Sequence, residues 1–292
     1  MNRLSAGVHT IPLSDYVADP APCPSLNAGT AHTLLTLSPQ HAFLQHPRLN
    51  SDHASDQSSR LDIGTIAHAL LLENDSSRVV VIDAEDWRKK EAKDQRDEAR
   101  ALGQLPILSK DYFGIQEMVI QAQAQIAKSE FASDFQEAIA EQTLLWEHDG
   151  VWCRSRPDKA TPDWRILFDY KTVAGSANPH AFMRTIIQQG YDIQAELGRL
   201  GVEELGLCHQ VNFVFLAQEI EPPYAMSFIS LSPAWQDLAH RKLKIAMSMW
   251  KGCLRKNEWP TYRSDVAYLE PPAYASLDWE DNLSPIDAED FV

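Results

Sequence analysis

The sequence predicts an α/β protein with a central mixed β-sheet and helices on both of its faces. Two observations predict this fold class. The chain has 292 residues, of which 44% are hydrophobic, so it can bury a sizeable core. Segments with strand periodicity form two groups in the second half of the chain, and segments with helix periodicity precede, separate and follow these groups.

The first half of the chain predicts mostly helices. Residues 1–33 are rich in Pro, Ser, Ala and Thr with little periodicity, and we expect them to be irregular. Ser38 and Pro39 supply a helix cap and a proline at the first helical position, and Pro47 ends this short helix. Further along, the pattern predicts a polar loop at 50–60, a buried helix at 64–73, a short strand at 79–82 and a long helix at 109–141 with a break near 129–133.

The second half of the chain begins with a hairpin. Residues 143–148 alternate as a strand, Asp149-Gly150 is a two-residue turn, and residues 151–156 form the return strand. The later elements are a strand at 164–170, helices at 179–190 and 191–205, strands at 211–216 and 224–231, and a long amphipathic helix at 233–257.

The formal net charge of −15 is unevenly distributed. Residues 264–292 contain eight acidic residues and no Lys or Arg, which predicts a disordered acidic tail and leaves −7 for the rest. This balance excludes a uniformly basic nucleic-acid-binding protein, because such a charge repels phosphate at long range. We therefore expect an irregular segment at 1–33, a folded domain at 34–263 and a tail that serves either for solubility or for docking a partner protein.

Cysteine spacing and hydropathy predict where in the cell the protein is found. The four cysteines are far apart, so we expect neither disulfides, nor a cysteine-only zinc site, nor an iron–sulfur cluster. The N-terminus lacks the apolar segment of a signal peptide, and no run of about 18 apolar residues occurs. We expect a soluble cytoplasmic protein without a transmembrane helix.

The residues with the clearest chemical meaning are Asp158, Asp169 and Lys171. Asp169 and Lys171 are two apart on a predicted strand and therefore project from the same face. Asp158 ends the preceding strand, where a short connection can bring its carboxylate beside Asp169. Two converging carboxylates suit Mg²⁺ or Mn²⁺, and an ammonium group beside them can orient water or stabilise charge on a phosphate.

The alternative is a solvated surface pair, which is the usual role of Asp-x-Lys on a strand. The position of Asp169 on the strand favours a functional site, because it follows the apolar residues Ile166, Leu167 and Phe168. A buried strand that ends in charged residues is a common way to build a functional site.

The pattern Pro157-Asp158 with Asp169-Tyr170-Lys171 resembles the signature of the PD-(D/E)XK nuclease superfamily. More specifically, residues 33–262 resemble the exodeoxyribonuclease VIII (RecE-type) exonucleases of phages and prophages. The blocks that carry this resemblance are 37–41, 64–73, 86–90, 150–159, 169–172, 190–194 and 258–260. The resemblance implies a PD-(D/E)XK nuclease fold with an αβββαβ core.

The resemblance also implies roles for individual residues. Asp158 and Asp169 match the two metal-binding carboxylates, the carbonyl of Tyr170 is a further ligand, and Lys171 matches the catalytic lysine. His68 matches the histidine of a G-x-x-x-H helix and is an additional metal ligand. A lone histidine on an apolar helix is more often a core residue, but Gly64 and the downstream motif favour the ligand.

Three further positions follow from the same comparison. Gln194 and Tyr191 match the helix that lines the site, where related nucleases carry Q-x-x-x-Y. This chain has Gly198 at the last motif position, and Tyr191 is a candidate to replace that tyrosine. Glu147 is interpreted as a surface partner of Arg154 or Arg156, with a second metal as the alternative.

The charged stretch at 85–100 has two interpretations. Its equal numbers of acidic and basic residues are typical of a solvated helix. The resemblance favours contact with DNA, and the candidate DNA-binding residues are Arg88, Lys89, Lys90 and Arg96.

The implied function is Mg²⁺-dependent digestion of linear double-stranded DNA, with Mn²⁺ as a substitute. Digestion runs 5′→3′, releases 5′-mononucleotides and leaves 3′ single-stranded overhangs for recombination by strand annealing. The implied partners are double-stranded DNA ends, a phage single-strand annealing protein and further copies of the chain in a ring-shaped homo-oligomer. Two alternatives stay open: a structure-selective or single-strand nuclease of the Cas4/RecB-nuclease type, and a catalytically silent recombination scaffold.

Overall fold

The computed structural model of the chain describes residues 3–50, 63–73 and 76–272. The chain divides into two compact units, Met1–Pro260 and Thr261–Val292, and every element described below belongs to the first. The predicted polar loop (from residue 51) and the predicted acidic tail (from residue 273) lie outside the described residues.

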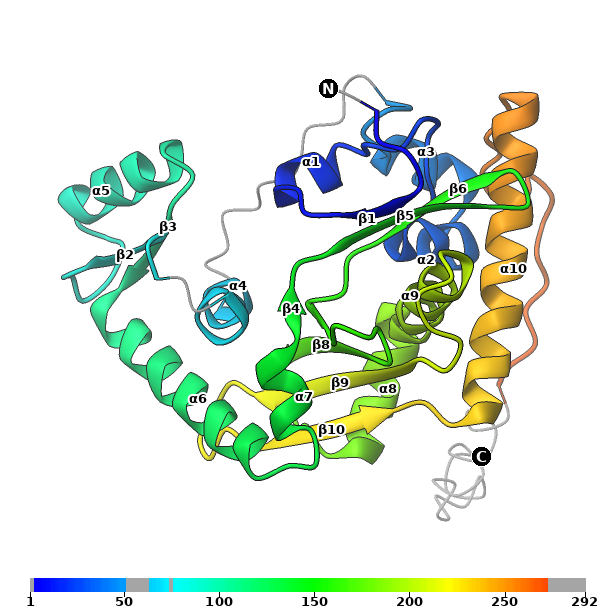
Figure 1. Cartoon of the computed structure of the whole chain (residues 1–292). Coiled ribbons are helices and arrows are strands. Elements are labelled where there is room, and N and C mark those ends of the chain that lie inside the picture. Colours follow the sequence, from blue (N-terminus) through cyan, green and yellow to red (C-terminus); the bar gives the residue numbers. More distant parts are fainter. Residues whose placement is uncertain (1–2, 51–62, 74–75, 273–292) are drawn as a thin grey trace, which may run out of the picture. The chain divides into compact units, whose positions relative to one another are not determined.

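A mixed five-stranded sheet lies at the centre of the first unit (Figure 1). Its strand order is β10-β9-β8-β7-β4; β8 and β9 are parallel and the other neighbours are antiparallel. The strands are β4 (Ile139–Ala140), β7 (Lys159–Ala160), β8 (Ile166–Val173), β9 (Asn212–Glu219) and β10 (Met226–Ser230).

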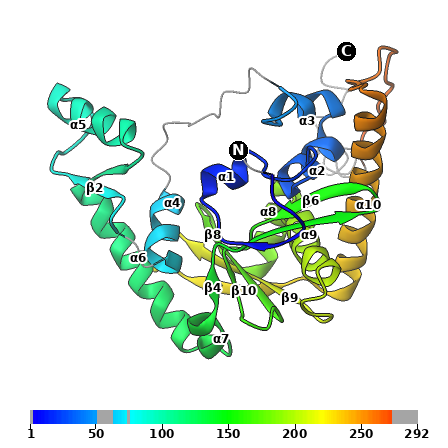
Figure 2. The same ribbon diagram turned by 45° about the horizontal axis from the view of Figure 1, so that its top comes forward.

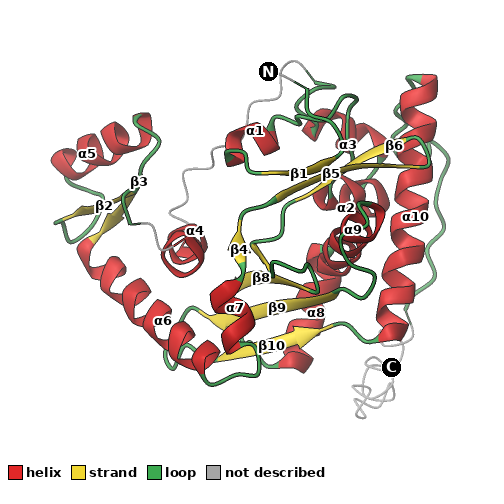
Figure 3. Ribbon diagram, in the orientation of Figure 1, coloured by secondary structure: helices red, strands yellow, loops and turns green. Residues whose placement is uncertain are grey.

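Helices lie on both faces of this sheet (Figure 3), and an apolar core fills the space on each face. Leu167 of β8 packs into one core, and its neighbours Ile166 and Phe168 pack into the other, as the two-residue period of a strand requires. The first core is completed by α2 (Ala28–Thr36), α3 (Pro39–Gln45), α8 (Pro179–Gln189), α9 (Tyr191–Glu204) and α10 (Pro233–Lys256). The second is completed by α4 (Ile63–His68), the π-helical turn η1 (Ala69–Glu73), α6 (Ser109–Ala127) and α7 (Ala132–Glu137). The predicted mixed sheet with helices on both faces is confirmed.

The predicted hairpin forms, but it bends away from the central sheet. β5 (Thr143–His148) and β6 (Val151–Ser155) pair around Asp149 and Gly150, whose positive φ angles of 49° and 78° are those of a tight hairpin turn. Together with β1 (Gly7–His9) they make a separate three-stranded sheet. The two arms of the hairpin re-enter the central sheet as β4 and β7.

These bends are important for the site because they carry carboxylates. Glu141 occupies one bend with a φ of 60°, and Asp158 lies at the other, between β6 and β7. The amide of Glu141 donates a hydrogen bond of 3.0 Å to the carbonyl of Asp158, so the two bends are held side by side.

A smaller parallel pair, β2 (Val79–Ile82) and β3 (Leu105–Leu108), is connected through α5 (Lys90–Ala101). β2 was predicted, and the charged stretch is helical from Lys90. The long helix predicted at 109–141 is present and divides at the predicted break into α6 and α7. None of the described helices is both long and apolar enough to cross a membrane.

The N-terminal segment departs from the sequence prediction. Residues 1–33 were expected to be irregular, but they contain β1, α1 (Leu13–Val17) and the start of α2. The prediction is wrong here because β1 gains its partners from β5, and because the side chain of Asn27 caps α2 by accepting from the amide of Thr30 at 2.8 Å. Residues 1–33 are therefore part of the same compact unit as the sheets.

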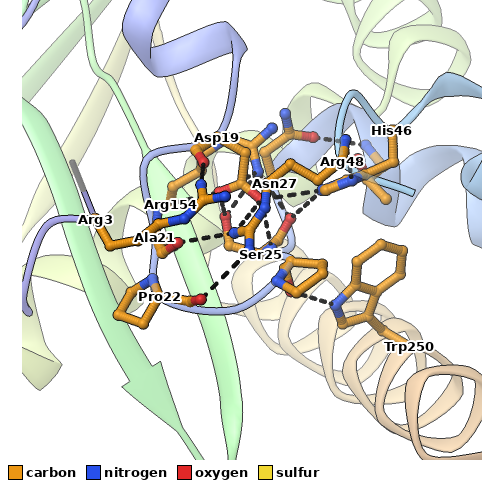
Figure 4. A network of polar contacts seen from close by, with 12 residues as sticks. Arg3, Asp19, Ala21, Pro22, Ser25, Asn27, His46, Arg48, Arg154 and Trp250 are labelled. Carbon is orange, nitrogen blue, oxygen red and sulfur yellow. Dashed lines mark hydrogen bonds and ion pairs between the residues drawn. The ribbon is translucent and has the colours of Figure 1, made fainter. Parts of the chain in front are cut away.

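A buried carboxylate, Asp19, fastens this segment to β6 (Figure 4). It accepts from the amide of Ser25 at 2.9 Å and from its hydroxyl at 2.6 Å. His46, Arg48 and Arg154 lie 3.3, 3.4 and 3.5 Å from its oxygens. Although burial raises the pKa of Asp19, the hydrogen bond to His46 and the charge of Arg154 outweigh it and lower the pKa to about 2.

We predict that Asp19 makes stability depend on acid pH. Because its folded pKa is below the unfolded value, its contribution is present above about pH 4 and is lost as the pH falls toward 2, by about 2–3 kcal/mol. Asp19→Asn removes that part of the pH dependence and costs roughly 3–5 kcal/mol at neutral pH, because it leaves Arg154 buried without its partner. Urea unfolding between pH 2 and 7 measures both effects.

The exposed residue Asp94 provides the control for this measurement. Asp94→Asn should leave both the free energy of unfolding and its pH dependence unchanged. If Asp19→Asn unfolds with the parent's pH dependence, Asp19 does not have the role assigned to it.

Candidate active site

The site begins at the C-terminal half of β8, where Asp169 and Lys171 follow the buried apolar part of the strand. Asp169 is 1% exposed, and the Lys171 Nζ lies 2.6 Å from its Oδ1. The two side chains share one face of the strand, as the sequence predicted. The intervening Tyr170 points to the opposite face, where its hydroxyl donates to Gln218 at 2.6 Å.

Helix α9 supplies the next two predicted residues. The Gln194 Nε2 donates to Asp169 Oδ2 at 2.5 Å, and the Lys171 Nζ lies 4.6 Å from the centre of the Tyr191 ring. The other carboxylate oxygen of Asp169 faces Lys171, so both oxygens of this buried group have partners.

The structure shows why Gly198 is compatible with this helix. A Cβ at Gly198 would lie 3.2 Å from Phe213 and 3.3 Å from Leu167, which is tighter than an ordinary contact. Gly198 therefore packs against the apolar part of the sheet, whereas Tyr191, seven residues earlier on α9, reaches Lys171. Tyr191 also stacks on Phe215, with 5.9 Å between the ring centres.

Asp158 contacts both β8 and His68. Its Oδ2 accepts a 2.7 Å hydrogen bond from the amide of Tyr170, and its Oδ1 lies 3.0 Å from the Nε2 of His68. The predicted short connection thus brings Asp158 to the strand that carries Asp169. The amide of Tyr170, at a position beyond the β7 pairing, finds its acceptor in this carboxylate.

His68 lies at the end of α4, where the helix changes to a π-helical turn. The Glu141 Oε1 is 3.4 Å from the His68 Nε2, and the Glu73 Oε1 is 3.7 Å from the His68 Nδ1. A π-turn contains more residues than an α-turn, so Glu73, five residues after His68, returns to the same side. His68, Glu73 and Glu141 offer ligand atoms within 4.8 Å of one another.

The concentration of carboxylates changes the protonation of the site. Burial lowers the pKa of His68, but the hydrogen bond to Asp158 and the charges of Glu141 and Glu73 outweigh it and raise the pKa to about 9. Burial raises the pKa of Asp169 to about 6, although Lys171 acts in the opposite direction. Burial lowers the pKa of Lys171, but the charges of Asp169 and Asp158 outweigh this and raise it.

These groups border a cleft of about 760 Å³. His68, Asp158, Tyr170, Lys171 and Tyr191 all line it. Asp169 lies beneath this lining, and Gln194 lines a neighbouring cavity of about 300 Å³. The structure therefore brings the predicted catalytic and metal-binding residues into one region; their individual roles stay predictions.

Several lining residues were not singled out by the sequence. The remaining residues at the cleft that carry charge or a hydroxyl are Tyr16, Thr65, Glu73, Arg78, Glu141, Arg156 and Thr172. Glu73 lies within a block that resembles the exonucleases and could have been noticed there. Glu141 depends on the bend of the hairpin, for which no short motif exists.

The interpretation of Glu147 is not supported by the contacts. Arg156 forms its ion pair with Glu141 instead, and Arg154 lies 3.5 Å from Asp19. Glu147 is exposed on β5, opposite Trp152. The acidic residue of the hairpin that reaches the site is therefore Glu141.

The candidate DNA-binding residues Arg88, Lys89, Lys90 and Arg96 do not line this cleft. Lys90 and Arg96 lie on α5, and Arg88 and Lys89 directly precede it. Arg88 pairs with Asp86 at 3.0 Å and Arg96 with Asp97 at 2.8 Å, so two of these cations have acidic neighbours. Their role in DNA binding stays a prediction.

The donor set fits a divalent cation. It combines one imidazole with several carboxylates, and oxygen ligands of this kind suit Mg²⁺ and Mn²⁺. The raised pKa of His68 reflects an excess of negative charge that a cation would offset. Among the described residues, His68, Glu73 and Glu141 form the group whose ligand atoms lie close together, and Asp158 lies 3.0 Å from the same imidazole. That Asp158 and Asp169 hold the ion with His68 stays a prediction.

Comparison with known proteins identifies the family of this chain. The family model described as "PDDEXK-like domain of unknown function (DUF3799)" matches residues 35–272. The chain belongs to this family. The match covers the elements from α3 to α10 and every site residue named above except Tyr16, so the α/β fold is that of the PD-(D/E)XK nucleases.

One solved structure agrees with the fold of the PDDEXK-like family. A protein from Eubacterium rectale named "putative exonuclease" matches with a TM-score of 0.54 and 11% identity, covering 87% of this chain and 92% of that chain. A "phage related exonuclease" from Haemophilus somnus 129PT matches with a TM-score of 0.32 and 10% identity over 80% of this chain and 96% of that chain, which is too low to carry an argument. No curated protein matches the chain.

We predict that Glu141 contributes to cation binding and that Glu147 does not. Glu141→Gln keeps the size of the side chain but removes a charge beside His68, so we expect the affinity for Mn²⁺ to fall about tenfold or more. Glu147→Gln, the matched control six residues along the same hairpin arm, should bind Mn²⁺ as the parent does. Isothermal titration calorimetry of both variants distinguishes them, and equal affinities would contradict the assignment.

Proposed function

We propose that this protein is a Mg²⁺-dependent exodeoxyribonuclease of the RecE type that degrades linear double-stranded DNA. The observation that carries the proposal is the meeting of Asp158, Asp169 and Lys171 with His68 at one cleft, in a chain of the PDDEXK-like family. The name of the Eubacterium rectale neighbour supports an exonuclease over other nucleases. Mn²⁺ is expected to substitute for Mg²⁺.

The carboxylates and the imidazole would hold the cation in the proposed reaction. When bound, it supplies Lewis acidity toward a phosphodiester oxygen and toward water. Asp158 is oriented for this role by the amide of Tyr170, and Asp169 by Gln194. Because these partners are a strand backbone and a helix side chain, the two carboxylates need little rearrangement before the reaction.

Lys171 supplies positive charge and hydrogen-bond donors. The charges of Asp169 and Asp158 raise its pKa, so the ammonium form dominates at neutral pH. In that form Lys171 cannot accept a proton, and its role is to position water and to stabilise negative charge on the phosphate. Tyr191 packs against the ammonium group and limits its movement.

The polarity and partners of the reaction are part of the same proposal. Digestion proceeds 5′→3′ and leaves 3′ overhangs, which a phage single-strand annealing protein receives for recombination. A ring-shaped homo-oligomer would keep the enzyme on the duplex. These features rest on the resemblance to RecE-type exonucleases, as does the proposed contact of Arg88, Lys89, Lys90 and Arg96 with DNA.

We predict that purified protein with Mg²⁺ shortens linear duplex DNA from its 5′ ends and leaves covalently closed circles intact. Release of label from duplexes labelled at the 5′ or the 3′ end measures polarity. Asp169→Ala and Lys171→Ala should each slow hydrolysis about 100-fold or more, because each removes a charge placed for the transition state. Both variants need a thermal unfolding curve to confirm that they are folded.

The exposed carboxylate Asp163 and the exposed cation Arg165 pair with each other at 3.0 Å and provide matched controls. Asp163→Ala and Arg165→Ala should digest linear duplex at the parent's rate. Intact linear duplex after incubation with Mg²⁺ would indicate a catalytically silent scaffold. Equal cutting of circles and linear duplex would indicate an endonuclease, and digestion of single strands alone would indicate the Cas4/RecB-nuclease type.

A further inference from the structure

Helix α10 carries a row of exposed cations that the proposed reaction does not use. The helix has six Lys or Arg residues and a single acid, Asp237, near its start. Four of the cations are exposed and lie on one side of the helix: Arg241, Lys244, Lys251 and Arg255. At about 100° per residue, these four and Ser248 fall within a sector of roughly 80° and extend over about 21 Å.

None of these four cations forms an ion pair with another residue in the described part of the chain. The Lys251 Nζ donates to the carbonyl of Asp149, which leaves its charge without a carboxylate partner. By contrast, Lys242 on another side of the same helix pairs with the buried Asp192 at 2.6 Å.

Three acidic residues beside the row have contacts of their own. Asp149 lies 3.7 Å from His148, and Glu204 lies 2.9 Å from the same imidazole. Glu196 pairs with Arg199 at 2.9 Å and with His240 at 2.9 Å. Asp237 lies on the same side of α10, one turn before Arg241, and offsets part of the row's charge. The row still carries a local excess of positive charge, although the protein as a whole has a net charge of −15.

The row is held rigidly. The opposite side of α10 is buried through Leu243, Ala246 and Trp250, and the Trp250 indole donates to the carbonyl of Pro24 at 3.3 Å. A long helix fixed in this way keeps its exposed cations in a straight line.

The row is separate from the cleft. α10 packs on α9, α2, α3 and β6, whereas His68 is at the end of α4, on the other side of the central sheet. Figures 1 and 2 both show α10 and α4 on opposite sides of this sheet.

We propose that Arg241, Lys244, Lys251 and Arg255 form a second contact with the sugar–phosphate backbone of duplex DNA. The identity of the ligand as DNA rests on the proposed function. A straight row of about 21 Å matches the regular phosphate spacing of about 3.4 Å along one strand, so several phosphates lie within its reach. The four cations and Ser248 form a continuous polar line, which favours a regular polyanion.

The test measures binding without hydrolysis. The affinity of the full-length protein for a 40-base-pair duplex is determined by fluorescence anisotropy in EDTA, over a range of salt concentrations. The variant carries Arg241→Gln, Lys244→Gln, Lys251→Gln and Arg255→Gln. Because each phosphate contact adds about 0.9 to the salt slope, we expect the slope to fall by about 3–4 and the affinity at low salt to fall more than about tenfold.

A control variant removes the same number of cations away from α10, at four exposed positions: Lys110→Gln, Lys128→Gln, Arg165→Gln and Arg184→Gln. It should bind the duplex within about twofold of the parent and with the parent's salt slope. Thermal unfolding of both variants confirms that they are folded.

The outcomes separate this proposal from the proposed function. A row variant with the parent's affinity and salt slope overturns the proposal, whatever the nuclease assay shows. A loss of affinity for polyglutamate but not for DNA would also overturn it and assign the row to an acidic polypeptide. A parent that binds duplex through the row but fails to hydrolyse it would overturn the nuclease proposal alone.

Discussion

The burial of the Asp169 carboxylate is the constraint on which the rest of the site depends. A charge at 1% exposure requires partners, because desolvation otherwise favours the neutral form. Lys171 on the same strand and Gln194 on α9 occupy its two oxygens. Asp158 and Glu141 lie beside His68 and raise the pKa of this imidazole, and a bound divalent ion would offset their charge.

The cluster of carboxylates depends on the β5–β6 hairpin, whose two arms continue into the central sheet as β4 and β7. Its bends carry Glu141 and Asp158, and the hydrogen bond between their backbones holds them together. One arm of the hairpin is fixed through Arg154, which reaches the buried Asp19 of the N-terminal segment. The segment before α2 thus contributes to the position of Asp158, although it lies outside the residues matched by the family model.

The sequence was sufficient for the fold class, and the structure brings most of the residues that it singled out into one region. Local signals were strong at the Asp149-Gly150 turn and at the capped starts of α3 and α10, and the structure has the expected elements there. β4 and β7 have two residues each, too few for a periodic pattern, so they were missed. Glu141 was missed with them, because its place in the site depends on a bend rather than on a motif.

The structure shows where some of the charges that make up the net charge of −15 are located. Part of it comes from carboxylates gathered at the cleft, and the row on α10 is a local exception to it. The central claim is that His68, Asp158 and Asp169 hold the divalent ion together. Anomalous diffraction from crystals soaked in Mn²⁺ tests it most directly: we expect a peak in contact with all three side chains. A peak held only by Glu73 and Glu141, or no peak at this cleft, would contradict the account.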